Sequence, residues 1–203
     1  MMKSKFLNRL RAFRQAEDGT AAVELVLAVP ILVWALMSTM VYFDAFHKKT
    51  LSVRAALTMA DMFSREQTSI DNNYLNGAQS LLKTLSLPDG TPDMRVTVYY
   101  YVSDEKRYYS VWSEVRGTAF SPMTNADLAG LNSRLPLMSD GDRSILVETR
   151  TDYHAPFSIG IGPFLQTNLE DKVFHTFTVI SPRFSSTLCI DKPPYNDIEG
   201  DLC

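Results

Sequence analysis

Residues 20–43 read TAAVELVLAVPILVWALMSTMVYF, and this stretch decides how the rest of the chain is interpreted. Glu24 is its one charged residue, and the other side chains are apolar, aromatic or small. From Ala21 to Phe43 there are about 23 residues, or roughly 34 Å of α-helix at 1.5 Å per residue. That length crosses a hydrocarbon core of about 30 Å with a modest tilt. The sequence therefore predicts one membrane-spanning helix, which we place at residues 20–46.

A cleavable secretory signal peptide is the first alternative to a retained span. Its apolar part is usually about 7–15 residues long and ends at a small-x-small cleavage site. Here the apolar run is longer, and its end at residues 37–42 (MSTMVY) is a poor cleavage site. We therefore expect the helix to be retained. Pro30 lies in its middle, where membrane helices tolerate proline if a neighbouring helix or a local kink satisfies the freed carbonyl.

Basic residues on either side of the span predict its orientation. The segment before it carries five of them, Lys3, Lys5, Arg9, Arg11 and Arg14. The segment after it carries three in a comparable window, Lys48, Lys49 and Arg54. Because basic flanks stay on the cytoplasmic side, the N-terminus is predicted inside and most of the chain is predicted to be exported.

Glu24 is the anomaly in this helix. A carboxylate one turn inside a membrane costs on the order of 1–3 kcal/mol, depending on its depth. In the simplest explanation, the side chain lies near the interface and reaches the headgroups. Its neighbours in the sequence suggest a more specific role.

The run Gly19-Thr20-Ala21-Ala22-Val23-Glu24, between a basic leader and an apolar helix, resembles a type IV prepilin processing site. The longer run from Asp18 to Pro30 resembles more specifically the TadE-like family of minor pseudopilins, which belong to bacterial tight-adherence (Flp-type) pilus systems. The resemblance is specific over about residues 15–45. It departs from the pilin pattern at Leu25, since an aromatic residue often follows the glutamate in pilins.

This resemblance implies that a prepilin peptidase removes residues 1–19 by cutting after Gly19. Thr20 then becomes the N-terminus, and Glu24 becomes the fifth residue of the mature chain. The implied partners are the inner membrane, the peptidase, the major pilin, other minor pseudopilins and the pilus assembly platform. The implied location is the bacterial inner membrane, as a single-pass protein with a cytoplasmic N-terminus and a periplasmic or extracellular C-terminal domain.

The motif also has a physical rationale. Cleavage leaves an α-ammonium group at Thr20, and the Glu24 carboxylate lies one helical turn away. In a filament of packed apolar helices, the carboxylate of one subunit can neutralise the amine of its neighbour. A paired charge is tolerable in a low dielectric, whereas an isolated one is not. Glu24 is therefore our candidate residue for setting the register of assembly.

After the span, the pattern predicts two helical segments. Apolar residues recur at spacings of three and four from His47 to about Glu66, so the anchor helix is expected to continue outward and pack on a globular domain. A second helix is predicted from Asn73 to Leu85 and ends at a Pro-Asp-Gly turn. A short third helix is predicted at residues 125–131, capped by Thr124 or Asn125.

Segments rich in Val, Tyr and Thr predict an antiparallel sheet of roughly four strands. The predicted strands are Met94–Val102, Tyr108–Val115, Ser144–Tyr153 and Lys172–Ile180. The order of helices and strands predicts an exported α+β domain at residues 47–183, in which the long N-terminal helix packs on the sheet. The pilin resemblance implies the same broad architecture.

Both cysteines, Cys189 and Cys203, lie in a C-terminal tail that we place at residues 184–203. Their position on either side of a Pro-containing segment suits a disulfide formed in an oxidising compartment. Closing a loop of about 15 residues would contribute roughly 3 kcal/mol. Two unrelated thiols are the alternative. The formal net charge of −3 gives the chain no general attraction to nucleic acid.

The sequence offers no recognisable catalytic or metal site. His47, His154 and His175 are far apart and have no ligand at metal spacing, and we expect His175 to be a half-buried structural residue. No Gly-x-Ser-x-Gly elbow occurs, and residues 160–163 (GIGP) predict a turn rather than a phosphate loop. Residues 140–144 (DGDRS) lack the ligands of a calcium loop and predict a polar turn before a strand.

An aromatic cluster is predicted across the first two strands. It comprises Tyr99, Tyr100, Tyr101, Tyr108, Tyr109 and Trp112. We favour core packing and cross-strand pairing, because alternation lets only some of these side chains point inward. An exposed docking surface is the alternative, since aromatic residues anchor interfaces.

We therefore expect a TadE-like minor pseudopilin that takes part in assembly or display of an adhesive pilus, and not an enzyme. No metal or cofactor is expected. The alternative is a bitopic membrane protein whose exported domain binds or senses a ligand and never enters a filament. An exported hydrolase on a membrane tether would need a nucleophile and a base at a recognisable spacing, which the sequence does not offer.

Overall fold

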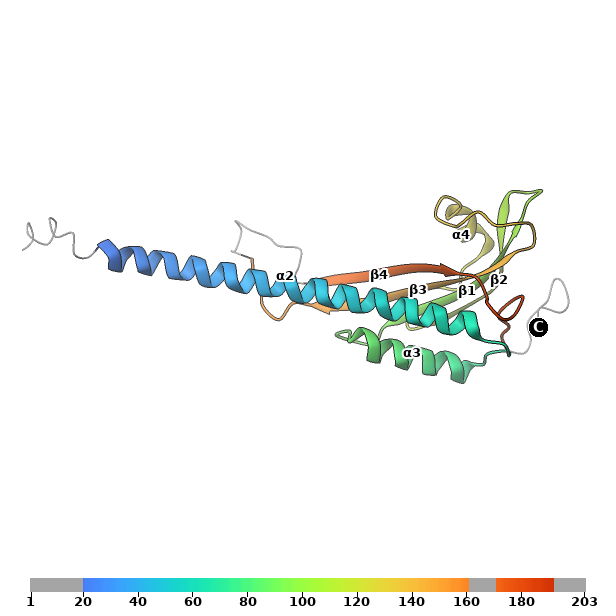
Figure 1. Ribbon diagram of the computed structural model, residues 1–203, viewed down its shortest axis with the longest axis horizontal. Coiled ribbons are helices and arrows are strands. Elements are labelled where there is room, and N and C mark those ends of the chain that lie inside the picture. The colour runs from blue at the N-terminus through green and yellow to red at the C-terminus, as the bar shows by residue number, and fades with distance from the viewer. Residues whose placement is uncertain (1–19, 161–170, 192–203) are drawn as a thin grey trace, which may run out of the picture.

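The computed structural model of the chain describes residues 20–160 and 171–191 (Figure 1). Its helices and strands, in chain order, are α2 (Thr20–Arg65), α3 (Asn72–Ser86), β1 (Asp93–Val102), β2 (Arg107–Arg116), α4 (Asn125–Gly130), β3 (Arg143–His154) and β4 (Asp171–Ile180). A long helix extends from an α+β domain that contains a four-stranded antiparallel sheet. The predicted α+β class, the long apolar N-terminal helix and the four-stranded sheet are confirmed.

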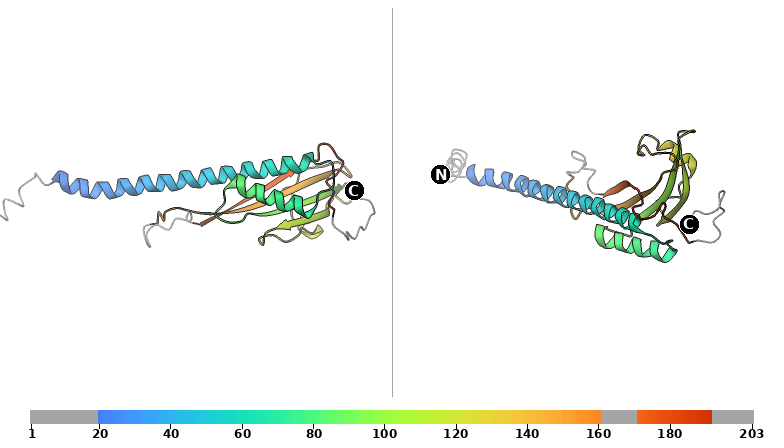
Figure 2. Two further views of the ribbon diagram at one scale, coloured as in Figure 1. Left: turned by 90° about the horizontal axis from the view of Figure 1, so that it is seen from below. Right: turned by 45° about the vertical axis from the view of Figure 1, so that its right-hand side comes forward.

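Helix α2 is continuous over 46 residues, or about 69 Å at 1.5 Å per residue. The predicted span and the helical segment after it therefore form one helix. Its C-terminal half packs on the domain through Ala55, Met59 and Phe63, which are buried. A spacing of four residues keeps these side chains on one side of the helix. The N-terminal half extends beyond the sheet, as Figures 1 and 2 show.

Helix α3 begins at a local cap, where the Asp71 carboxylate accepts a hydrogen bond from the Tyr74 N–H at 2.7 Å. Leu75, Ala78 and Leu82 are buried on the side facing the domain. Their spacing of three and four residues is that of one helix face. The second predicted helix is confirmed, and it begins and ends one residue beyond the predicted limits.

The strands lie in the order β2-β1-β3-β4, and all neighbours are antiparallel. Each predicted strand is confirmed to within one residue at both ends. Alternate residues of a strand face opposite sides of the sheet. In β4, Ile180 accordingly packs under the helices, whereas Phe177 and Val179 pack on the other face.

The sheet has a hydrophobic core on each face. Helices α2 and α3 cover the first face, where the core includes Met59, Phe63, Val96, Ile145, Val147 and Leu188. The segment that contains α4 covers part of the second face, near the β1–β2 hairpin (Figure 1). The core there comprises Tyr99, Tyr108, Met123, Leu128, Leu135 and Leu146. The long helix is therefore joined to a domain with cores of its own.

Thr124, rather than Asn125, caps α4. The Thr124 hydroxyl accepts the Asp127 N–H, and the Asp127 carboxylate accepts the Thr124 N–H at 2.9 Å, which makes a capping box. The Asn125 side-chain oxygen instead accepts the Ser110 N–H at 2.8 Å. This second hydrogen bond ties the start of α4 to β2.

The first part of the predicted C-terminal tail packs into the domain. Leu188 is only 1% exposed, and its carbonyl accepts a hydrogen bond from the Trp112 indole at 2.8 Å. Ile190 forms a parallel β-bridge with Ile70. The packed domain thus extends past residue 183, at least as far as residue 191.

The predicted disulfide cannot be followed to its second partner, because Cys203 lies outside the described residues. Cys189 is half-buried within the packed part of the tail. Its backbone carbonyl accepts a hydrogen bond from the Ile70 N–H at 3.0 Å. This contact holds the tail beside the start of α3.

The prediction that His175 is half-buried was wrong. The residue is exposed on β4, which is an edge strand. Its ring contacts the Phe120 ring edge-to-face, with centroids 5.9 Å apart. The core on this face of the sheet instead contains the neighbouring Phe177, because the segment with α4 lies over that end of the strand.

Candidate functional site

The N-terminal part of α2, residues 22–33, is the surface that most needs a partner, and we call it the free helix. All of its side chains are exposed, including Val26 at 70% and Leu27 at 65%. A helix that is apolar on every side is stable in water only when something else covers it. Within the described residues, α2 is the one helix long and apolar enough to cross a membrane.

Glu24 is the one charged residue of the free helix. Its side chain is exposed between the apolar, exposed Val23 and Leu25. Thr20 is the first residue of α2, so Thr20 and Glu24 lie one turn apart on the same side of the helix. Gly19, the other predicted cleavage-site residue, lies outside the described residues. A cut before Thr20 would therefore create an amine one turn from the Glu24 carboxylate.

Pro30 lies within α2 and does not end it. Because proline has no N–H, the carbonyl of Val26 loses the donor that a helix normally supplies four residues later. In a bilayer such a carbonyl needs another donor or a local adjustment of the helix. The free helix therefore presents one backbone acceptor to its surroundings as well as one carboxylate.

Residues 155–160, which follow β3, lie against α2 where the free helix meets the domain (Figure 1). The Trp34 indole Nε1 donates a hydrogen bond to the Ile159 carbonyl at 3.1 Å. Ile159 and Val41 are both buried, whereas Phe43 on α2 is 77% exposed. From Trp34 onward, one side of α2 is therefore covered by the domain while the other side remains open.

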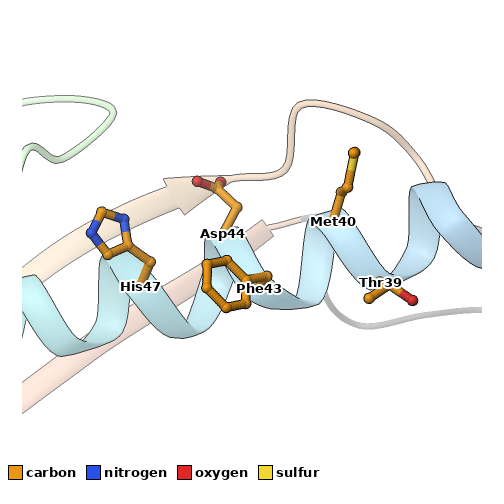
Figure 3. A pocket seen from close by; sticks show the side chains of 5 residues that line it. All are labelled: Thr39, Met40, Phe43, Asp44 and His47. Carbon is orange, nitrogen blue, oxygen red and sulfur yellow. The ribbon is translucent and has the colours of Figure 1, made fainter.

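A shallow groove of about 290 Å³ lies on α2 next to this junction (Figure 3). Thr39, Met40, Phe43, Asp44 and His47 line it. Its surface is mainly apolar, and its two ionisable groups lie at the end nearer the domain. The groove marks the level at which α2 changes from apolar to charged side chains.

Charged side chains from four chain segments gather at this level. Lys48 Nζ lies 3.9 Å from Asp89 Oδ1 in the turn between α3 and β1, and Asp89 Oδ2 accepts the backbone N–H of His154 at 2.8 Å. The His154 ring pairs through Nδ1 with Asp171 at the start of β4, and this hydrogen bond raises the pKa of His154 above its ordinary value. Together with Asp44 on α2, we call these residues the charged belt.

No family model, curated protein or solved structure matches this chain. Among the residues that the structure describes, no group of three or more His, Cys, Asp and Glu side chains is placed to hold a metal ion. The free helix with Glu24 and the charged belt are the candidate functional surfaces.

The aromatic cluster forms core packing and cross-strand pairs, as the favoured prediction stated. Tyr99 and Tyr108 are buried, and their rings meet edge-to-face with centroids 5.7 Å apart. Tyr100 and Tyr109 stack across the hairpin, also with centroids 5.7 Å apart. Trp112 is buried in the core beneath the helices.

Residues 140–142 form the predicted polar turn, and Arg143 and Ser144 begin β3. Asp140 Oδ1 accepts the Ser103 N–H at 2.7 Å, which ties this turn to the β1–β2 hairpin. Asp142 Oδ2 accepts the Ser139 N–H at 3.0 Å. Both carboxylates therefore serve to hold turns in place.

Sequence reasoning missed the contact between Trp34 and Ile159 and the place of Asp89 in the charged belt. A signal for the first existed, because residues 155–160 (APFSIG) carry no charge although they follow a polar strand. No pattern in the sequence indicated the place of Asp89 in the charged belt. Asp89 belongs to a turn, and its partner His154 lies 65 positions further along the chain.

Proposed function

We propose that this chain is a membrane-anchored, pilin-like subunit, and more specifically a TadE-like minor pseudopilin that takes part in assembly or display of an adhesive tight-adherence pilus. The free helix carries this proposal. It is apolar on all sides, bears one carboxylate at Glu24, and continues without a break into the helix that packs on the antiparallel sheet. Such a helix suits two environments in turn, a bilayer before assembly and a bundle of like helices afterwards.

Processing of the leader creates the charge that Glu24 needs. In this proposal a prepilin peptidase cuts after Gly19 and leaves an ammonium group on Thr20. The Glu24 carboxylate of one subunit then pairs with the amine of its neighbour, which offsets the cost of placing either charge among apolar helices. The expected partners are the peptidase, the major pilin, the other minor pseudopilins and the assembly platform of the inner membrane.

One observation favours a second function. A polar cavity of about 400 Å³ lies beside the start of β3 and the residues that follow β4. Its lining residues are Leu137, Met138, Ser139, Asp142, Arg143, Ser144, Ser181, Pro182 and Ser186. The Arg143 guanidinium and the four serine hydroxyls suit a polar or anionic ligand. The alternative is therefore a membrane-anchored, exported binding or sensing domain that does not enter a filament.

The N-terminus of the mature protein distinguishes the two functions. We would purify the protein from host cells with and without the prepilin peptidase and measure its N-terminal mass. The pseudopilin proposal predicts a chain that begins at Thr20 in the first case and keeps residues 1–19 in the second. A Gly19→Leu variant should keep its leader in both strains, and a Gln15→Ala variant is the control for a neutral change in the leader.

A leader that remains intact in cells with the peptidase would overturn the pseudopilin proposal. The anchored binding domain would then be the better description. If the leader is removed at another position, the role given to Glu24 fails as well, since the new amine would not lie one turn from its carboxylate.

A further inference from the structure

We propose that the segment of residues 155–160, between β3 and β4, inserts into the leaflet of the membrane that faces the domain, beside α2. This inference rests on the proposed membrane anchorage of the chain. It adds a second element to the anchor, which would hold the domain directly on the bilayer. The partner of this surface is therefore lipid.

The Trp34–Ile159 hydrogen bond shows how far residues 155–160 extend along α2. Trp34 lies ten residues before Asp44, the first charged residue of α2 after Glu24, and ten residues correspond to about 15 Å of helix. The Ile159 carbonyl is bonded to the Trp34 indole. The segment around Ile159 therefore lies about 15 Å closer to the N-terminal end of α2 than Asp44 does.

The free helix alone is too short to span a membrane. Its twelve residues, 22–33, measure about 18 Å, against a hydrocarbon core of about 30 Å. If only this part were embedded, the exposed side chains of Met40 and Phe43 would remain in water. When the span extends to Phe43 its length is sufficient, but residues 155–160 then enter the bilayer with the helix against which they pack.

The chemistry of residues 155–160 suits this position. The segment carries no charged side chain, and Phe157 is 49% exposed. Backbone groups within a membrane must find hydrogen-bond partners in the protein. Pro156 has no N–H to satisfy, and the Ile159 carbonyl already accepts the Trp34 indole hydrogen.

The charged belt gives the second, independent argument for lipid. Charged side chains from α2, the end of β3, the start of β4 and the turn before β1 come together in the charged belt. There Lys48, Asp89 and His154 form a connected set of contacts. A bilayer surface requires such a common boundary on every element that crosses it, whereas a protein partner does not. The belt therefore matches the headgroup region, and Phe157 lies on its hydrocarbon side.

Photo-crosslinking to lipid tests the inference on the full chain. We would reconstitute the protein in vesicles of phosphatidylethanolamine and phosphatidylglycerol, with the photoreactive residue p-benzoylphenylalanine at one position at a time. The positions are Phe157, Leu27 on the free helix, and Phe184, which is 61% exposed at the other end of the domain. After irradiation, mass spectrometry identifies phospholipid adducts. All three side chains are exposed, so the substitutions are expected to leave the fold intact, which thermal unfolding checks.

The expected result is a phospholipid adduct at Phe157 comparable to that at Leu27, with no adduct above background at Phe184. An adduct at Leu27 without one at Phe157 would overturn this inference and leave the membrane anchor standing. Absence of an adduct at Leu27 would remove the anchor, and the inference with it. A crosslink from Phe157 to a second copy of the chain in place of lipid would also overturn it.

Discussion

The side-chain oxygens of Ser52 and Thr151 lie 2.9 Å apart in a buried contact between α2 and β3. The contact lies one helical turn beyond Lys48 of the charged belt, on the side of α2 that packs on the sheet. The neighbouring Ala55 and Ala56 on α2 are small and buried, so they bring the helix close to the sheet but make no directional contact through their side chains. The hydrogen bond between the two hydroxyls therefore fixes how the helix is placed along the strand.

Removing both of these hydroxyls should cost less than the sum of the costs of removing each one alone. A Ser52→Ala change leaves the buried Thr151 hydroxyl without its partner, which should lower the free energy of unfolding by about 1–3 kcal/mol. Thr151→Val should have a similar effect. The double variant should lose less than the sum of the two, because no polar group remains unpaired. Urea unfolding of the four proteins in detergent measures the coupling, and strictly additive losses would contradict this role.

Two glycine substitutions should change stability in opposite directions. Gly117 has φ +101°, and a Cβ there would lie 1.9 Å from Asp93 Oδ1, which accepts the Thr118 N–H at 2.7 Å. Gly117→Ala should therefore cost at least about 1–3 kcal/mol. Gly77 lies within α3, and its Cβ would meet nothing within 4 Å, so Gly77→Ala should add about 0.5–1 kcal/mol. If Gly117→Ala melts at or above the temperature of the unchanged protein, the turn at Gly117 tolerates a side chain, and if Gly77→Ala melts lower, the prediction for α3 is wrong.

The start of the C-terminal tail should matter for folding. Leu188 is buried under α2 and α3, so Leu188→Ala should lower the free energy of unfolding by about 2–5 kcal/mol. Phe184 is exposed nearby in the chain, and Phe184→Ala should change stability by no more than about 0.5 kcal/mol. Chemical unfolding compares the two variants. Equal, small effects would mean that the domain ends before residue 188.

The parts of the fold that the sequence predicts well are those with a local cause. The limits of the strands follow from alternation and from the turns beside them, and α3 follows from its stripe of Leu75, Ala78 and Leu82 together with the turn that ends it. The continuity of α2 follows from the unbroken helical pattern through His47. In each case the residues that decide the structure lie within a few positions of one another.

The parts that escaped prediction depend on contacts between distant residues. Trp34 and Ile159 are 125 positions apart, and no local pattern says that the connection after β3 turns toward the free helix. The placement of Leu188 in the core depends on Trp112, 76 positions earlier. His175 was misjudged for a related reason, since the alternation of β4 does not reveal how much of its second face the segment with α4 covers. The candidate site was predicted at Glu24 but not at the charged belt.

The pair of His154 and Asp171 should make stability depend on pH. The hydrogen bond to Asp171 raises the pKa of His154 above its ordinary value, and the nearby Asp89 and Asp152 add to the shift in the same direction. A raised pKa in the folded state means that the stabilisation is fully present below the ordinary histidine pKa of about 6.5 and is lost as the pH rises through the raised value. The His154–Asp171 pair should therefore stabilise the folded protein most in mildly acidic conditions.

A His154→Gln variant isolates this effect. Its melting temperature should fall below that of the unchanged protein at about pH 5.5, and the difference should shrink toward zero as the pH rises through the raised pKa of His154. His175→Gln is the control, because the ring of this exposed histidine contacts Phe120 rather than a carboxylate. If the difference in melting temperature between His154→Gln and the unchanged protein stays constant across this pH range, the His154–Asp171 pair makes no pH-dependent contribution to stability.

Glu24 offers the sharpest mutational test of assembly, because it is far from both cores of the domain. Glu24→Gln keeps the shape of the side chain and removes its charge, so the domain should melt as before. In the proposed filament, the Thr20 ammonium of a neighbouring subunit would then have no carboxylate to meet among the apolar helices, and an unpaired charge is costly there. We expect the amount of the protein that co-purifies with sheared pili to fall roughly tenfold, which corresponds to a loss of about 1.4 kcal/mol per contact. Removal of the leader should continue in this variant, so a loss of incorporation would report on pairing rather than on processing. Incorporation at the unchanged level would mean that the carboxylate serves only to reach the headgroups before assembly.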